Sequence, residues 1–159
     1  MCYMKHILIL AFSFAAILPS FAQVKRDKNQ PVAGIIFPRG SKITNDNFRG
    51  TAYLKMLMDA DSLNPTSVGN VTFEPGARTK WHMHPGGQIL LVMDGVGYYQ
   101  EKGQAKKLLR KGDVIKCPTN VPHWHGASAD TAFVQVAITN RHLGETVWLQ
   151  DVTDDEYTK

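Results

Sequence analysis

The feature that most limits the fold of this chain is a series of short runs rich in β-branched and aromatic residues, beginning at Thr51. Gly, Pro, Asn or Asp separates these runs at intervals of about 8 to 12 residues, as in antiparallel sandwiches and barrels. Helical periodicity is absent after Thr51, except for a possible last turn at Val152–Tyr157. The pattern therefore predicts an all-β fold of antiparallel strands.

Composition limits the classes of function. The chain has 159 residues, with 18 Lys and Arg against 14 Asp and Glu, and this length suits one domain. The basic residues near Lys102 and Arg110 are mixed with acidic residues and turn glycines, without a recognition helix or an aromatic platform, so we expect no nucleic-acid partner. Two cysteines are too few for a disulfide framework.

The N-terminus has the pattern of a secretory signal peptide over residues 1–22. Lys5 precedes the apolar run Ile7–Leu18, and small residues precede a cleavage site after Ala22. The apolar run is shorter than the roughly 20 residues that span a bilayer, so we expect no stable membrane anchor after cleavage. We expect an exported protein, periplasmic or secreted.

The mature chain divides into two parts. Residues 23–50 are polar and interrupted by prolines, which predicts an extended N-terminal arm with one short strand near Ile35–Phe37. Residues 51–159 form the predicted barrel. The only cysteine left after cleavage is Cys117, which lies at a predicted strand end, and we expect it to be buried. The arm favours contact with a neighbouring copy, and hence a homodimer.

Four histidines form two His-X-His pairs, which are the strongest chemical signal in the sequence. His82 pairs with His84, and His123 pairs with His125. Residues two apart in a strand share a face, so each pair directs two imidazoles the same way. Gln88 follows the first pair after a tight turn. Imidazole nitrogens with an amide oxygen suit a divalent transition metal.

The spacing around the first pair resembles the first cupin motif, G(x)5HxH(x)3E(x)6G. Gly76, His82, His84 and Gly95 occupy the motif positions, and Gln88 stands where the motif has Glu.

The spacing around the second pair resembles the second cupin motif, G(x)5PxG(x)2H(x)3N. Gly112, Pro118 and His123 match it, while Asn120 replaces Gly and Ala127 replaces the final Asn. Asn tolerates positive φ better than most residues, so the turn at Asn120 is compatible with the motif.

The double match implies a cupin jelly-roll barrel with one divalent metal in its lumen, held by His82, His84, Gln88 and His123. Over Phe48–Tyr157 the sequence is also similar to small bacterial cupins that include manganese-dependent hydroxynitrile lyases and carboxymuconolactone decarboxylase-associated cupins. In those lyases a Gln likewise takes the fourth ligand position. The resemblance favours manganese, and the ligand types also accept Fe, Zn, Ni, Co or Cu.

His125 is not needed as a ligand in this scheme. Because it shares a face with His123, we expect its ring in the lumen, where it can act as a proton shuttle. Two alternatives stay open, a hydrogen-bonded lumen residue without catalytic duty and a direct metal ligand. On the next run, Gln135 and Thr139 lie on the predicted lumen face and are candidate substrate-binding residues. The lyases carry His and Gln there, so this sequence departs at both positions.

The sequence thus predicts an exported metal-dependent enzyme that acts on a small carbonyl or hydroxy compound, with carbon–carbon lyase chemistry like that of hydroxynitrile lyases. An oxygen-activating cupin dioxygenase is the alternative enzyme. A binding module that holds metal or a small ligand without turnover is the alternative of another class.

Overall fold

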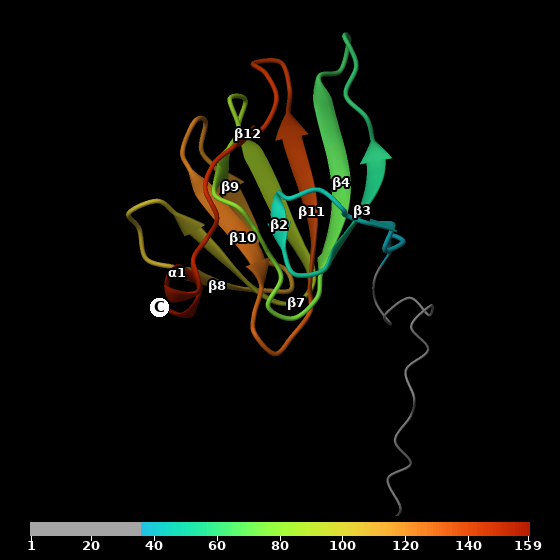
Figure 1. Cartoon of the computed structure of the whole chain (residues 1–159). Helices are drawn as coiled ribbons and strands as arrows, with labels where there is room; N and C mark the ends of the chain where they lie inside the picture. Colours follow the sequence, from blue (N-terminus) through green and yellow to red (C-terminus); the bar gives the residue numbers. More distant parts are fainter. Residues whose placement is uncertain (1–35) are drawn as a thin grey trace, which may run out of the picture. The chain divides into compact units, whose positions relative to one another are not determined.

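Antiparallel strands curl into a half-open barrel in the computed structural model, which describes residues 36–159 (Figure 1). Every strand pair within this range is antiparallel, in agreement with the all-β prediction. The elements are β1 (Ser41–Lys42), β2 (Phe48–Arg49), β3 (Ala52–Met58), β4 (Thr66–Phe73), β5 (Arg78–Thr79), β6 (His82–Met83), β7 (Gln88–Glu101), β8 (Lys107–Arg110), β9 (Val114–Cys117), β10 (His123–Ala127), β11 (Phe133–Asn140), β12 (Val147–Trp148) and α1 (Asp154–Thr158).

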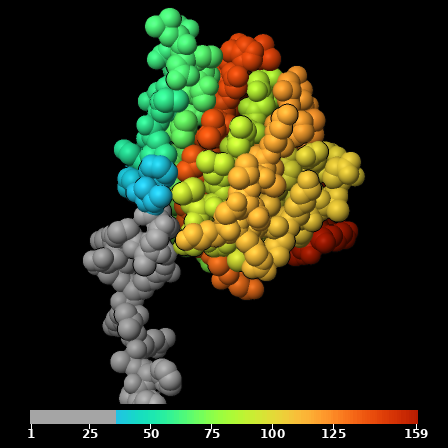
Figure 2. Space-filling view, turned by 180° about the vertical axis from the view of Figure 1, so that it is seen from behind, coloured from blue at the N-terminus to red at the C-terminus, as the bar shows by residue number. Residues whose placement is uncertain are grey.

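The strand order brings distant parts of the sequence together. The main path runs β1-β3-β4-β11-β7-β10-β5-β2, with β8 and β9 also paired to β7. Seen from behind, the green β3 and β4, the orange-red β11, the yellow-green β7 and the orange β9 lie side by side (Figure 2). The concave side of this curved sheet holds the core and the site.

Strand β7 joins the two halves of the barrel. Its first half pairs with β9 and β11, and its second half pairs with β8 and β10. The sequence pattern predicts two separate strands here, interrupted at Asp94 and Gly95, but the structure contains one strand of 14 residues. Only glycine fits where the strand passes from one half of the barrel to the other. The φ of Gly95 is 80°, and a Cβ there would lie 1.8 Å from the oxygen of Ala132. The turn signal therefore marks a bend within the strand.

Two apolar clusters lie on opposite sides of the histidine strands. The larger one fills the barrel interior and includes Phe73, Leu90, Tyr99 and Phe133. The smaller one consists of Trp81, Trp124, Val152 and Tyr157. Trp81 and Trp124 alternate with the histidines along the chain, so they pack on the opposite side, as the period of two predicts.

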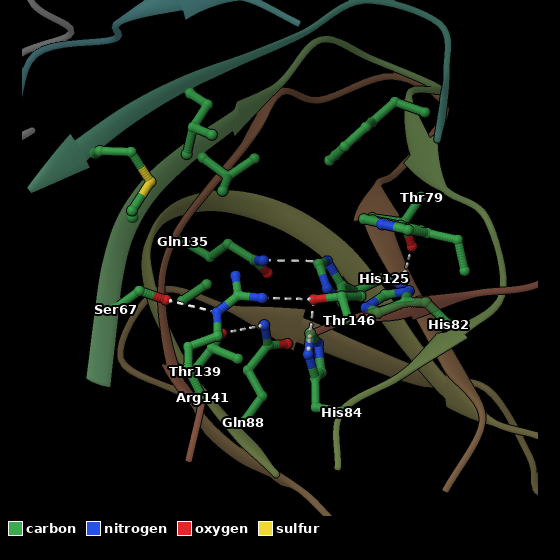
Figure 3. A pocket seen from close by; sticks show the side chains of 17 residues that line it. Ser67, Thr79, His82, His84, Gln88, His125, Gln135, Thr139, Arg141 and Thr146 are labelled. Carbon is green, nitrogen blue, oxygen red and sulfur yellow. Dashed lines mark hydrogen bonds between the residues drawn. The ribbon is translucent and has the colours of Figure 1, made fainter. Parts of the chain in front are cut away.

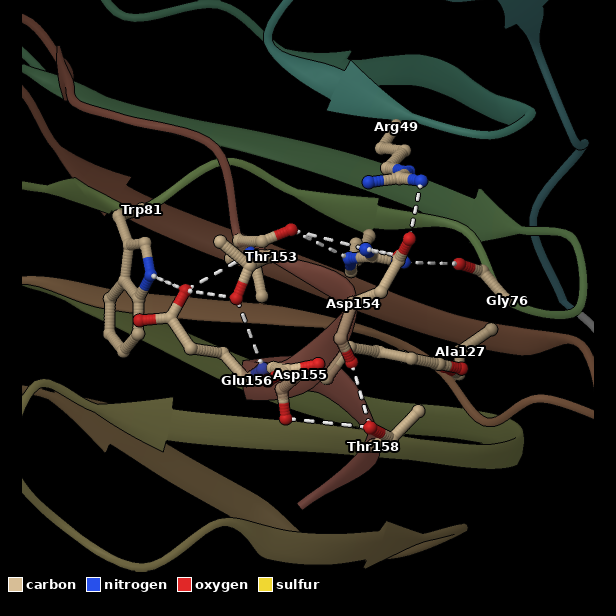
Figure 4. A network of polar contacts seen from close by, with 12 residues as sticks. Arg49, Gly76, Trp81, Ala127, Thr153, Asp154, Asp155, Glu156 and Thr158 are labelled. Carbon is tan, nitrogen blue, oxygen red and sulfur yellow. Dashed lines mark hydrogen bonds and ion pairs between the residues drawn. The ribbon is translucent and has the colours of Figure 1, made fainter.

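The C-terminal segment fastens onto the outside of the histidine strands (Figure 4). The buried guanidinium of Arg78 donates hydrogen bonds to the carbonyl of Val152 and to the carboxylate of Asp154, at 3.1 and 2.7 Å. The hydroxyl of Tyr157 donates to the carbonyl of Ala127 in β10, at 2.9 Å. Thr153 and Glu156 form a capping box at the start of α1. These contacts hold β5 and β10 together behind the site.

Part of the predicted N-terminal arm pairs with the barrel. Ser41 and Lys42 lie opposite β3, and Phe48 lies opposite Thr79. Residues 36 and 37 are not in a strand, so the prediction of a strand near Ile35–Phe37 is wrong for the described part of that segment. Pro38 follows them directly and has no N–H to donate to a neighbouring strand. Pairing begins instead at Ser41.

The predicted signal peptide at residues 1–22 lies outside the described residues, as does the arm before residue 36. Within residues 36–159, no helix has the length and the apolar character needed to cross a membrane. The positive φ of 57° at Asn120 confirms that Asn takes the turn position where the motif has Gly.

Candidate metal centre

The two histidine pairs meet across a strand pairing. His82 in β6 lies directly opposite His123 in β10, and their ring centroids are 4.4 Å apart. The rings of His84 and His125 lie 5.0 and 5.1 Å from that of His82. The structure thus brings together all four histidines that the sequence singles out.

Backbone contacts fix the orientation of two of these rings. Nδ1–H of His82 donates to the carbonyl of Lys80, and Nδ1–H of His123 donates to the carbonyl of Val121, both at 2.9 Å. With Nδ1 occupied in this way, the lone pair of each ring lies on Nε2. Metal-binding histidines characteristically use one nitrogen for a backbone carbonyl and the other for the metal.

The remaining nitrogens lack partners in a buried site. Nε2 of His84, His123 and His125 is buried without a hydrogen-bond partner among the described residues. Burial is the main cause that lowers the pKa of His82 and His125 well below 6.5 and that of His84 to about 3. The rings are therefore neutral imidazoles, the form that binds metal, and the cluster fits a divalent ion.

The histidine donors that lie nearest one another differ in one member from the predicted ligand set. One ring nitrogen from each of His82, His123 and His125 lies within 4.8 Å of the others, which makes a triad that can bind a metal. The sequence assigns His84 and Gln88 to the ligand set in place of His125. His84 lies close by, with its ring 5.5 Å from that of His123.

Contacts at both the nitrogen and the oxygen of its amide hold the Gln88 side chain in the lumen. Its Nε2–H donates to Oγ1 of Thr139 at 2.9 Å, and its Oε1 points toward His84 (Figure 3). The thiol of Cys117, which is buried as predicted, lies 3.9 Å from the same Oε1. Thr139, a predicted substrate-binding residue, therefore also orients the amide oxygen of a predicted ligand.

His125 lies deep in the lumen and contacts Gln135. Nε2–H of Gln135 donates to Nδ1 of His125 at 3.0 Å, and both side chains are buried (Figure 3). The edge of the His125 ring packs against Phe73. The predicted proton shuttle and the predicted substrate-binding residue thus form one buried pair.

A cavity of about 120 Å³ opens onto these side chains. Gln135 and Thr139 line it, as the assignment of one face of β11 to the lumen predicts. Apolar side chains line the rest of the cavity: Phe48, Leu54, Met56, Val71 and Trp148.

Sequence reasoning missed several residues that line this cavity, among them Arg141, Thr146 and Trp148. Arg141 and Thr146 lie in the loop after β11, where no strand period indicates a direction. Trp148 packs on His82 with ring centroids 4.9 Å apart. His142, next to Arg141, is exposed.

The buried neutral histidines predict that acid destabilises the metal-free protein. The unfolded chain binds protons on these rings near their ordinary pKa of about 6.5, whereas the folded rings stay neutral. Their contribution to the free energy of unfolding is therefore complete above pH 6.5 and is lost as pH falls from there toward the pKa of His84, about 3. In this window each histidine lowers the free energy of unfolding by at most about 1.4 kcal/mol for each unit that the pH falls.

Urea unfolding of EDTA-treated protein measures this effect. We expect the midpoint to change little between pH 7.5 and about pH 6.5, to fall from there to pH 5, and to fall less in a His84→Gln variant. A midpoint that is independent of pH over this range would contradict the neutral state of the rings.

Comparison with known proteins identifies relatives of the same kind. The cupin domain family matches residues 69–139. The (R)-mandelonitrile lyase of Granulicella tundricola is 42% identical over 115 residues, which cover 72% of this chain and 88% of the lyase.

Solved structures show the same architecture. A cupin-like protein from Thermotoga maritima has a TM-score of 0.75 and 51% identity, and the match covers 77% of this chain and 94% of that protein. A DMSP lyase from Ruegeria pomeroyi has a TM-score of 0.55 and 19% identity, over 69% of this chain and 55% of that one. The second likeness concerns the fold alone.

Proposed function

Because the chain belongs to the cupin family, we propose that it is a metal-dependent lyase that cleaves or forms a carbon–carbon bond in a small hydroxy or carbonyl compound. One observation carries this proposal: buried imidazoles with unpartnered Nε2 atoms cluster at a cavity that His84 and His125 line, in a chain 42% identical over 115 residues to a mandelonitrile lyase. Cyanohydrins are accordingly the first substrates to test. Cupin folds support many reactions, so the chemistry follows from the site and not from the fold.

We propose His82, His84, Gln88 and His123 as the ligands of one divalent transition metal, with manganese first among the candidates. All four are neutral, and a bound dication would supply an uncompensated positive charge, and hence a Lewis acid, beside the substrate oxygen. Thr139 keeps Oε1 of Gln88 available, because it accepts the amide N–H.

His125 and Gln135 would handle the proton. Cleavage of a cyanohydrin breaks the bond to the nitrile carbon, removes the hydroxyl proton and releases cyanide, which leaves with the electron pair and takes up a proton. When the amide oxygen of Gln135 accepts from Nδ1–H, the neutral His125 ring has its lone pair on Nε2, so it can accept the hydroxyl proton there and return it to cyanide. A half-turn of the Gln135 amide exchanges its donor for its acceptor at Nδ1, so Gln135 can support either ring tautomer.

Export through residues 1–22 and assembly as a homodimer complete the proposal, and both rest on the sequence pattern. A small molecule is the proposed substrate, with no nucleic acid among the partners.

A cyanohydrin assay tests the function. We expect purified, manganese-loaded protein to release benzaldehyde from mandelonitrile under anaerobic conditions, and EDTA treatment to abolish the release. Oxygen uptake with a small hydroxy or oxo substrate would point instead to a dioxygenase. Bound metal without turnover of either kind would support a binding module and contradict the lyase.

A further inference from the structure

The cavity lining includes one permanently charged side chain, the positively charged Arg141. Among the described residues that line it, Arg141 is the only side chain with a permanent charge, and no carboxylate is present. The other polar side chains of the lining are imidazoles, amides and hydroxyls. Arg141 enters from the loop that follows β11 and lies beside Thr146 and Gln88 (Figure 3).

The guanidinium is held in place but keeps one nitrogen available. Its Nε–H donates to Oγ of Ser67 at 3.1 Å, and Nη1 donates to Oγ1 of Thr146 at 3.2 Å. Nη1 also contacts the carboxylate of Glu145 at 2.5 Å. Within residues 36–159, Nη2 donates to no acceptor, so its two N–H groups remain for a ligand.

The ion pair with Glu145 does not cancel this charge inside the cavity. The Glu145 side chain is 84% exposed, so water screens its carboxylate, whereas Arg141 is only 26% exposed. The charge of Arg141 lies close to the histidines, because Oγ1 of Thr146, which accepts from Nη1, lies 3.2 Å from Nδ1 of His84. With a neutral ligand set and a cation at one wall, the cavity favours an anion.

We propose that Arg141 binds a carboxylate of the substrate, so that the natural substrate is a hydroxy or oxo compound that carries a negative charge. This inference rests on the proposed function, which places a hydroxy or oxo group at the histidines. Arg is suited to the task because its planar fork matches the geometry of a carboxylate. The apolar wall formed by Phe48, Leu54 and Trp148 would contact the carbon skeleton.

Two ligands of the same shape separate charge recognition from general binding. Mandelate and mandelamide share the ring and the hydroxyl and differ in the charge of one group. We expect calorimetric titration of the metal-loaded protein to show at least tenfold tighter binding of mandelate. We expect the Arg141→Gln variant to bind mandelate about 10- to 100-fold more weakly than the wild type. Its affinity for mandelamide should stay within about twofold of the wild-type value.

Two further variants serve as controls. Arg141→Lys keeps the positive charge but lacks the planar guanidinium. Its affinity for mandelate should lie between those of the wild type and Arg141→Gln. Glu145→Gln removes the competing carboxylate and should tighten mandelate binding. Unchanged mandelamide binding shows that each variant keeps its fold and its cavity.

Two results would overturn the proposal. Equal weakening of both ligands by Arg141→Gln would assign Arg141 a purely structural role. A preference for mandelate that survives Arg141→Gln would show that the metal alone recognises the charge. The titration needs no turnover, so loss of the preference in Arg141→Gln would stand even if the cyanohydrin assay of the wild-type protein failed.

Discussion

Replacing His82 and His84 together by Ala is expected to reduce the bound metal from about one ion per chain to less than about a tenth of that. The variant loses two of the neutral imidazoles around the lumen, including one whose Nε2 is buried without a partner. The remaining donors hold an ion much more weakly, because His123, His125 and Gln88 supply one atom each and His82, which belongs to both candidate ligand sets, is gone. Elemental analysis of protein expressed with excess manganese or iron, purified and dialysed, measures the loss.

His142→Ala is the matched control for this experiment. His142 is exposed and lies outside the cavity lining, so its removal should leave the metal content unchanged. Bound metal stabilises the folded state, so the melting temperature of the wild type and of His142→Ala should fall on EDTA treatment, and that of the double variant should not. Full metal occupancy in the double variant would refute the predicted centre.

Local pattern was sufficient to predict the strands and the histidine cluster. The direction of a side chain in a strand depends on a period of two, so the His-X-His pairs could be assigned to one face and Trp81 and Trp124 to the other before any fold was known. The resemblance to the two cupin motifs implied that the two pairs share one site, and the register of His82 opposite His123 agrees with this. Asn120 was foreseeable for a similar reason, since few other residues tolerate positive φ.

Features that depend on distant contacts were not predictable in this way. The sequence pattern predicts a turn at Gly95. In the structure the absence of a side chain there lets β7 continue where the backbone of Ala132 lies against it. The direction of Arg141 depends on Ser67 and Thr146, and no local pattern relates the three. The choice between His84 and His125 as ligand depends on the distances between the rings across the pairing of β6 with β10, which spacing alone does not specify.

His125→Gln is expected to separate catalysis from metal binding. The variant keeps a polar side chain of similar length at the end of the cavity but cannot take up a proton. We therefore expect its metal content to match that of the wild type and its kcat for mandelonitrile cleavage to fall by about 100-fold or more. Elemental analysis and an aldehyde-release assay on the same preparation give both quantities.

The same variant discriminates between the two possible ligand sets, because the nitrogens of His82, His123 and His125 also lie within 4.8 Å of one another. If His125 is a ligand, His125→Gln loses metal and activity together, and the proton role proposed for it is wrong. If His125 only fills the lumen, the variant keeps the metal content and the kcat of the wild type. Gln135→Leu adds a check, since it removes the amide at Nδ1 without touching the ring. Should His125 act on the proton, that variant lowers kcat and retains its metal, because the ring loses the partner that selects its tautomer.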